Sequence, residues 1–210
     1  FTVRNGALTV SADFKQVVSP VHGMEDPSAF RIGCPLLDKG DEFNRFPFTK
    51  NMRQTAQIGR FLRGFYEKAF GETPLFDSNE ELQGPKPQLY LHPFSQYALT
   101  VKRALNVIKQ KGFSGSIAII QINEDEDEMI RLRKMLEKES ISLAPLWASN
   151  DGDTRIITTS VERIKGLEYD ICFVVGMENA EHERLNFNKN RVYVSLSRPT
   201  QRLYMLCEYF

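Results

Sequence analysis

The connection Lys165-Gly166-Leu167-Glu168 joins two apolar runs, residues 155–161 and 171–177, and its residue types suit a phosphorylated, ribose-bearing ligand. Gly166 permits a close backbone approach, Lys165 supplies a positive charge, and Glu168 can accept hydrogen bonds from sugar hydroxyls. The connection leaves one buried strand and enters another, and ligands of open α/β sheets bind in the crevice at the carboxyl ends of the strands. We therefore expect a ligand at that edge, although a plain surface turn would account for the same four residues.

Strand-like and helix-like patterns alternate through the chain around this connection. We expect strands at 7–13, 88–92, 116–122, 154–160, 170–176 and 202–208, and helices at 57–66, about 95–111, from the acidic run 123–128 onward, and at 191–198. Residues 76–87 form a polar linker. Strands that are apolar on both faces and separated by amphipathic helices predict an α/β fold with a parallel sheet flanked by helices.

Composition excludes several classes of protein. Lys plus Arg equals Asp plus Glu at 27 each, so any nucleic-acid contact must be local. The three cysteines, Cys34, Cys172 and Cys207, fit neither a disulfide framework nor a zinc pattern, which favours an intracellular, cytoplasmic location. No apolar run has the length of a membrane span, so we expect no membrane partner. The missing initiator Met predicts that the chain is a piece of something longer.

Four segments, in order, resemble the motifs of the UvrD/Rep-like superfamily 1 helicases. The run "LTVSADFKQVV" resembles motif III, "FTKNMRQTAQIGRFL" is similar to motif IV, "TTSVERIKGLEYDICFVVGM" resembles motif V, and "RVYVSLSRPTQRLYML" is similar to motif VI. Together they bracket almost the whole chain. The resemblance implies a RecA-like (P-loop NTPase) fold, namely the second, C-terminal (2A) motor domain, with residues 1–50 as a motif III strand and irregular segment and 51–210 as the RecA-like domain.

The same resemblance assigns roles to individual residues. Arg53, Arg198 and Gln16 would be catalytic groups at the γ-phosphate, where planar guanidinium groups stabilise the charge that develops during phosphoryl transfer. Lys165, Gly166 and Glu168 would complete the nucleotide site, with Glu168 on the ribose. Thr159, Ser160 and Glu162 would contact nucleic acid. The implied cofactor is ATP with Mg²⁺, the metal being held mainly by an N-terminal RecA-like domain, and the implied partners are that domain and single-stranded or partly duplex DNA.

Three departures from the family pattern keep an alternative open. Glu162 stands where motif V has a histidine, Ala12 stands where motif III has a glycine, and the chain contains no phosphate loop. We therefore expect this chain to hydrolyse no ATP alone. The alternative is a degenerate helicase-like domain that serves as a non-catalytic binding or scaffold module. Under that alternative Arg198 would only cap a helix, and Arg53 would be an ordinary surface cation.

Overall fold

Five parallel strands form one sheet in the order β3-β7-β6-β4-β5. The computed structural model describes residues 2–4, 7–9, 51–74, 76–122, 125–145, 154–177 and 185–208. The strands of this sheet are β3 (Gln88–Leu91), β4 (Ser116–Gln121), β5 (Arg155–Ser160), β6 (Tyr169–Val175) and β7 (Pro199–Cys207). Because all five run the same way, their amino ends share one edge of the sheet and their carboxyl ends share the other.

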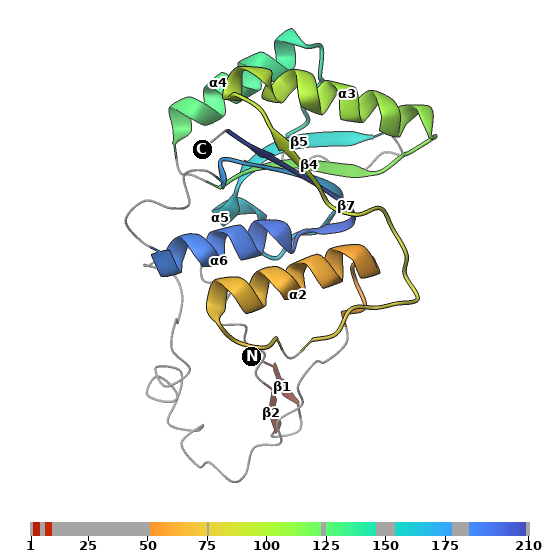
Figure 1. Cartoon of the computed structure of the whole chain (residues 1–210), viewed down its shortest axis with the longest axis vertical. Coiled ribbons are helices and arrows are strands. Elements are labelled where there is room, and N and C mark those ends of the chain that lie inside the picture. The colour runs from red at the N-terminus through yellow and green to blue at the C-terminus, as the bar shows by residue number, and fades with distance from the viewer. Residues whose placement is uncertain are drawn as a thin grey trace.

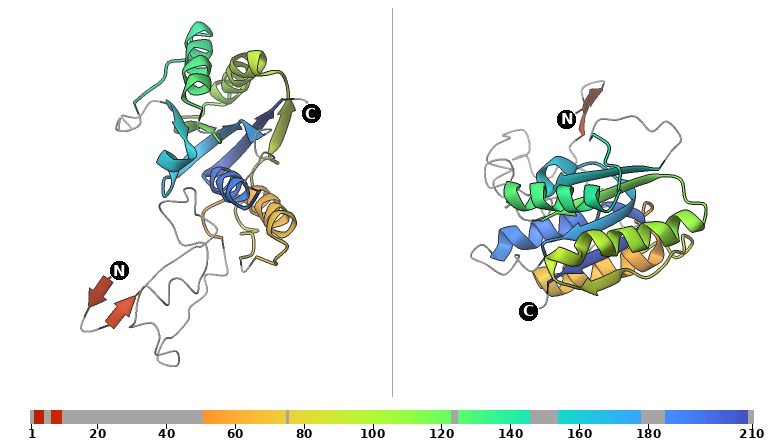
Figure 2. Two further views of the ribbon diagram at one scale, coloured as in Figure 1. Left: turned by 90° about the vertical axis from the view of Figure 1, so that its left-hand side faces the viewer. Right: turned by 90° about the horizontal axis from the view of Figure 1, so that it is seen from above.

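Helices cover both faces of the sheet (Figures 1 and 2). The helices are α2 (Ala56–Phe70), the 3₁₀ turn η3 (Phe94–Gln96), α3 (Tyr97–Gln110), α4 (Glu126–Lys138), the short α5 (Val161–Ile164) and α6 (Leu185–Leu196). One face packs against α2, α5 and α6, and the other packs against α3 and α4. The predicted α/β class, with a parallel sheet flanked by helices, is confirmed, and the arrangement is consistent with a RecA-like domain.

Alternation along the central strands divides the core in two. On β4, Ala118 and Ile120 face the α2, α5 and α6 layer, whereas Ile117 and Ile119 face α3 and α4. All four side chains are fully buried, which explains why β4 is an uninterrupted apolar run in the sequence. The helix expected from the acidic run onward is α4, and Asp125 caps it by accepting a hydrogen bond from the Glu128 backbone N–H at 3.0 Å.

The expected buried strand at 7–13 takes a different form. Ala7–Thr9 is a strand (β2), but it pairs antiparallel with Thr2–Arg4 (β1) in a separate two-stranded sheet and is no part of the parallel sheet. A three-residue strand has too few residues to show the period-2 alternation that would indicate which strand it pairs with. Residues 10–50, which include Gln16 and Ala12, lie outside the described part of the chain.

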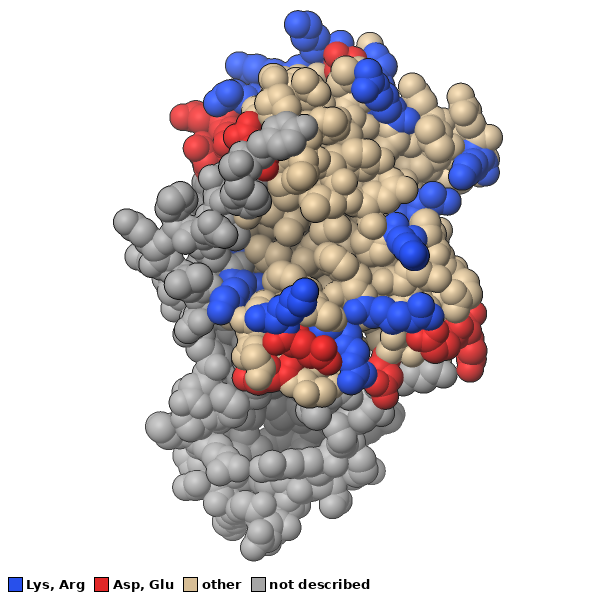
Figure 3. Space-filling model, in the orientation of Figure 1, with Lys and Arg blue, Asp and Glu red and all other residues tan. Residues whose placement is uncertain are grey.

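Charged groups of both signs lie on the face of the molecule that Figure 3 shows. On the face shown in Figure 3, blue and red side chains gather at the upper and lower borders of the coloured area, and its middle carries few charges. The mixture agrees with the balanced composition, because equal numbers of cations and anions create no long-range field of one sign. Within the part of the chain that the structure describes, no helix is both long enough and apolar enough to cross a bilayer.

Candidate nucleotide-binding edge

Arg53 and Glu168 form an ion pair at the amino edge of the sheet. Arg53 Nη1 donates to Glu168 Oε1 at 2.9 Å, and Arg53 Nη2 donates to the carbonyl oxygen of Ser197 at 3.0 Å. Glu168 directly precedes β6, and Ser197 lies two residues before β7. Both side chains of the pair are partly exposed, at 35% and 47%, so both can be reached by a ligand.

Arg198 lies beside this pair but is almost fully buried, at 2% exposure. Its Nε donates to the Val194 carbonyl oxygen at 2.9 Å, its Nη2 donates to Ser197 Oγ at 2.7 Å, and its Nη1 approaches the Leu167 carbonyl oxygen at 3.4 Å. Burial lowers the pKa of this guanidinium, and the nearby charge of Arg53 lowers it further. Two cations therefore stand close together near a single carboxylate, that of Glu168, which pairs with Arg53.

The connection Lys165-Gly166-Leu167-Glu168 lies at the amino edge of the sheet, just before β6. β5 ends at Ser160, at the carboxyl edge. From there the chain returns through α5 to the amino edge, and residues 165–168 directly precede Tyr169, the first residue of β6. The expectation that Lys165, Gly166 and Glu168 lie at the carboxyl edge is therefore wrong. The physical reason is general: two parallel strands can be joined only if the connection returns to the starting edge.

Gly166 has a backbone reason to be glycine. Its φ is +84°, in the left-handed region that other residues enter at a cost, and a Cβ added there would meet no atom within 4 Å. The glycine thus serves the turn as well as any ligand that approaches it. Lys165 is exposed beside it.

Sequence reasoning missed Gln54, which holds the amino edge together. Its side chain is 1% exposed, and its Nε2 donates to the carbonyl oxygens of Ser197 and Pro199, both at 3.0 Å. Asn51 Nδ2 in turn donates to Gln54 Oε1 at 2.6 Å. These bonds attach the segment before α2 to the start of β7. A glutamine that follows Arg53 in a polar run gives no sequence signal for burial.

The residues expected to contact nucleic acid lie at the opposite, carboxyl edge. Ser160 ends β5, and Thr159 beside it is 3% exposed. Glu162 accepts a hydrogen bond from Nη1 of Arg191, a buried side chain at 3% exposure whose Nε also donates to the Ile122 carbonyl oxygen at 2.8 Å. Glu162 is therefore the carboxylate partner of a buried arginine that sequence analysis did not single out.

The sequence-based site is thus brought together only in part. Arg53, Glu168 and Arg198 meet at the amino edge, Thr159, Ser160 and Glu162 lie at the other, and Gln16 falls outside the described residues. Within the described ranges, no group of three or more His, Cys, Asp or Glu side chains could hold a metal ion.

Comparison with known proteins gives a likeness in fold. The chain is similar to the crystal structure of the C-terminal domain of a possible DNA helicase from Lactobacillus plantarum WCFS1, with a TM-score of 0.54 and 21% sequence identity, over 74% of this chain and 86% of that one. The two chains share a fold. No family model matches the sequence. No curated protein matches it either.

Proposed function

We propose that this chain is the C-terminal motor domain of a superfamily 1 ATP-dependent DNA helicase of the UvrD/Rep-like kind. In this proposal it completes an ATP site between two RecA-like domains and contributes to translocation along single-stranded DNA. The helicase motifs in the sequence and the fold likeness to a possible helicase domain both support it. Closing the cleft around ATP and reopening it after hydrolysis would drive the movement.

One observation carries the proposal. Arg53 and Glu168 are 115 positions apart in the sequence and form an ion pair, with Arg198 beside it. These are three of the residues to which the helicase resemblance gives a nucleotide-binding role. A nucleotide fits the edge chemically, because two guanidinium groups face a single carboxylate and the buried Arg53 Nε has no hydrogen-bond partner among the described residues.

Each residue has a definite task in this proposal. ATP with Mg²⁺ supplies the transferable phosphoryl group, and the metal would be held mainly by the N-terminal RecA-like domain. Arg53 and Arg198 bind and neutralise phosphate oxygens, while Glu168 accepts hydrogen bonds from the ribose. Because Glu168 already holds Arg53, nucleotide binding would exchange a protein ion pair for contacts to the ligand.

A second candidate function has support from the same edge. Every nitrogen of the Arg198 guanidinium donates to an oxygen of this chain, so Arg198 must give up bonds before it can reach a phosphate. Glu162 is likewise occupied by Arg191. A domain in which these groups are purely structural would be a non-catalytic binding or scaffold module.

Single-strand-stimulated ATP hydrolysis separates the two candidates. The full-length protein that includes an N-terminal RecA-like domain is compared with the present 210 residues, each with and without an unstructured single-stranded DNA. The motor proposal expects stimulated turnover in the long protein and none in the short one. Equal absence of turnover in both would favour the scaffold.

A further inference from the structure

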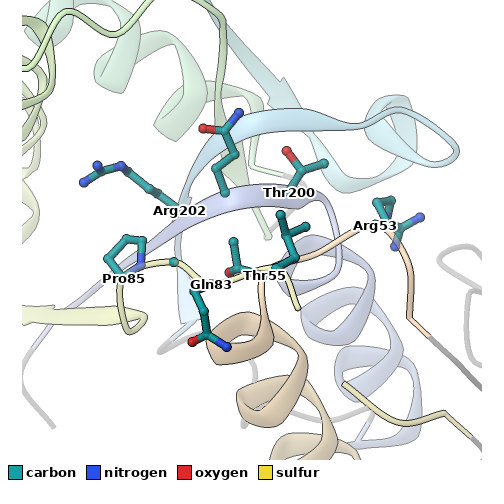
Figure 4. Close-up of a pocket in the computed structure, with 9 residues that line it drawn as sticks. Arg53, Thr55, Gln83, Pro85, Thr200 and Arg202 are labelled. Carbon is teal, nitrogen blue, oxygen red and sulfur yellow. The ribbon is translucent and has the colours of Figure 1, made fainter. Parts of the chain in front are cut away.

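An open pocket of about 450 Å³ lies beside the first residues of β7, next to the nucleotide-binding edge. Figure 4 shows side chains from the start of α2, the 82–85 segment and the start of β7 around it. The pocket is lined by Arg53, Thr55, Leu82, Gln83, Gly84, Pro85, Thr200, Gln201 and Arg202. Its volume lies in the range of small-molecule sites.

The charged residues that line this pocket are all cations. Arg53 and Arg202 line it, and no carboxylate belongs to the lining in the described part of the chain. Glu168 pairs with Arg53, and Asp170 accepts a hydrogen bond from Gln201 Nε2 at 2.8 Å, but neither acid lines the pocket. Within the described ranges the Arg202 side chain has no hydrogen bond or ion pair. The pocket therefore favours an anion.

Thr55 provides the second, independent observation. It is 3% exposed and lines the pocket, yet its Oγ1 has no hydrogen-bond partner among the described residues. Thr55 is also the N-cap of the 15-residue helix α2, but its hydroxyl caps no backbone N–H. A buried hydroxyl without a partner is destabilising, and a ligand oxygen would satisfy it. The positive end of the helix dipole adds to the attraction for an anion.

Gly84 brings the loop close to that hydroxyl. A Cβ built on Gly84 would lie 2.5 Å from Thr55 Cγ2 and 2.9 Å from Thr55 Oγ1, so any larger residue must displace the threonine. The Gly84 backbone N–H is held by Gln57 Oε1 at 2.7 Å, which fixes the loop against α2. Thr55 and the backbone at Gly84 therefore have little room to move in this wall of the pocket.

We propose that this pocket binds a phosphate group, as inorganic phosphate or as a phosphate monoester on a small sugar. Arg202 and Arg53 supply the positive charge, Thr55 Oγ1 donates to a phosphate oxygen, and Leu82 and Pro85 form an apolar wall for the rest of a monoester. The proposal goes beyond the nucleotide role of Arg53 and Arg198, and it holds whether or not the full-length protein hydrolyses ATP.

The test is isothermal titration of the 210-residue chain with inorganic phosphate and with ribose 5-phosphate at constant ionic strength. Arg202→Gln and Thr55→Val are each expected to weaken binding by about tenfold, because each removes a bond to a charged group. Thr55→Ser keeps the hydroxyl and should restore binding. Arg103→Gln, an exposed arginine on α3, is the matched control for Arg202→Gln and should change nothing.

Gly84→Ala tests the geometry in the same assay. It should lower the affinity for phosphate, whereas Gly64→Ala, at a glycine where an added Cβ meets no atom within 4 Å, should not. Circular dichroism of each variant shows whether it is folded. If Gly84→Ala fails to fold, the Thr55→Val and Thr55→Ser pair still decides the matter.

Several results separate this site from its neighbours. Tighter binding of ribose 5-phosphate than of phosphate supports a monoester site, and equal binding supports a site for the free ion. No saturable binding by the wild-type chain would overturn the proposal. The proposal would also be overturned if Arg198→Lys lost phosphate binding while Arg202→Gln retained it. That result would place the anion at the nucleotide-binding edge. A third result would overturn the proposal: a single-stranded oligonucleotide that binds more tightly than phosphate and loses this binding in Thr55→Val.

Discussion

Arg53 Nη1 donates to Glu168 Oε1 across 2.9 Å and 115 positions of sequence. The pair joins the segment before α2 to the first residue before β6, while Arg53 Nη2 reaches the carbonyl oxygen of Ser197, which precedes β7. Three separate stretches of the chain are therefore tied at one edge of the sheet by a single guanidinium group.

Glu168→Gln should leave stability nearly unchanged. The pair is partly exposed, and exposed ion pairs contribute under about 1 kcal/mol. The motor proposal also expects the same change to weaken ATP binding by the full-length protein, because an amide is a poorer acceptor for ribose hydroxyls than a carboxylate. Urea unfolding of the 210 residues and nucleotide titration of the full-length protein measure the two effects. A loss of stability with unchanged nucleotide affinity would make Glu168 a structural residue only.

Arg198→Lys should lower the free energy of unfolding by about 2–4 kcal/mol. A lysine cannot reproduce the three hydrogen-bonding directions of a buried guanidinium, and the oxygens of Ser197 and Leu167 would lose their donor. Urea unfolding checks this, with the exposed Arg103→Lys as control. At a temperature where the variant is fully folded, the motor proposal also expects at least a hundredfold loss in kcat for ATP. A fully folded variant with unchanged turnover would exclude Arg198 from the chemistry.

Glu162→Gln should destabilise the domain by about 2 kcal/mol. It removes the charge that faces Arg191, and that arginine is 3% exposed. Glu137→Gln, an exposed acid on α4, is the matched control and should be neutral. Thermal unfolding checks the difference. An unchanged melting temperature together with tighter binding of single-stranded DNA would instead show that Glu162 faces the nucleic acid.

Cys172 should make stability fall at alkaline pH. Burial raises the pKa of this thiol well above its ordinary value of 9.0, so the folded state holds the proton more tightly than the unfolded state. The stability that the buried, protonated Cys172 thiol contributes is fully present below pH 9.0, and it is lost as the pH rises further. Unfolding curves between pH 8 and 10 for the wild type and Cys172→Ala measure it, and the alanine variant should show the shallower decline. Identical slopes would contradict this account of the thiol.

The main elements of the sheet and its helices could be predicted from the sequence because their signals are local. The apolar run of β4 and the helical spacing of Ile58, Leu62 and Phe65 depend only on which faces are buried. The separate pairing of β1 with β2 could not be predicted, since three-residue strands carry no periodicity. The edge of the sheet at which Lys165 to Glu168 lie could not be predicted either. It depends on where along the connection the chain returns to the amino edge.

The residues of the candidate site divide in the same way, into those that the sequence singled out and those whose role depends on tertiary contacts. The helicase resemblance singled out Arg53, Glu168 and Arg198, and the fold brings them together. Gln54 and Arg191 were missed, because burial of a polar side chain depends on tertiary contacts with Ser197 and Ile122 that no local pattern encodes. The pocket at Thr55 was missed for the same reason, since its walls come from three segments.

Arg53 is proposed to complete an ATP site shared between two domains, and ATP turnover by the full-length protein carrying Arg53→Ala tests this role. We expect kcat with single-stranded DNA present to fall about a thousandfold, and turnover in the control Arg103→Ala to be unchanged. Urea unfolding should show that Arg53→Ala stays folded, because the ion pair with Glu168 is partly exposed. Turnover within a few-fold of the wild type would show that Arg53 does not act on ATP.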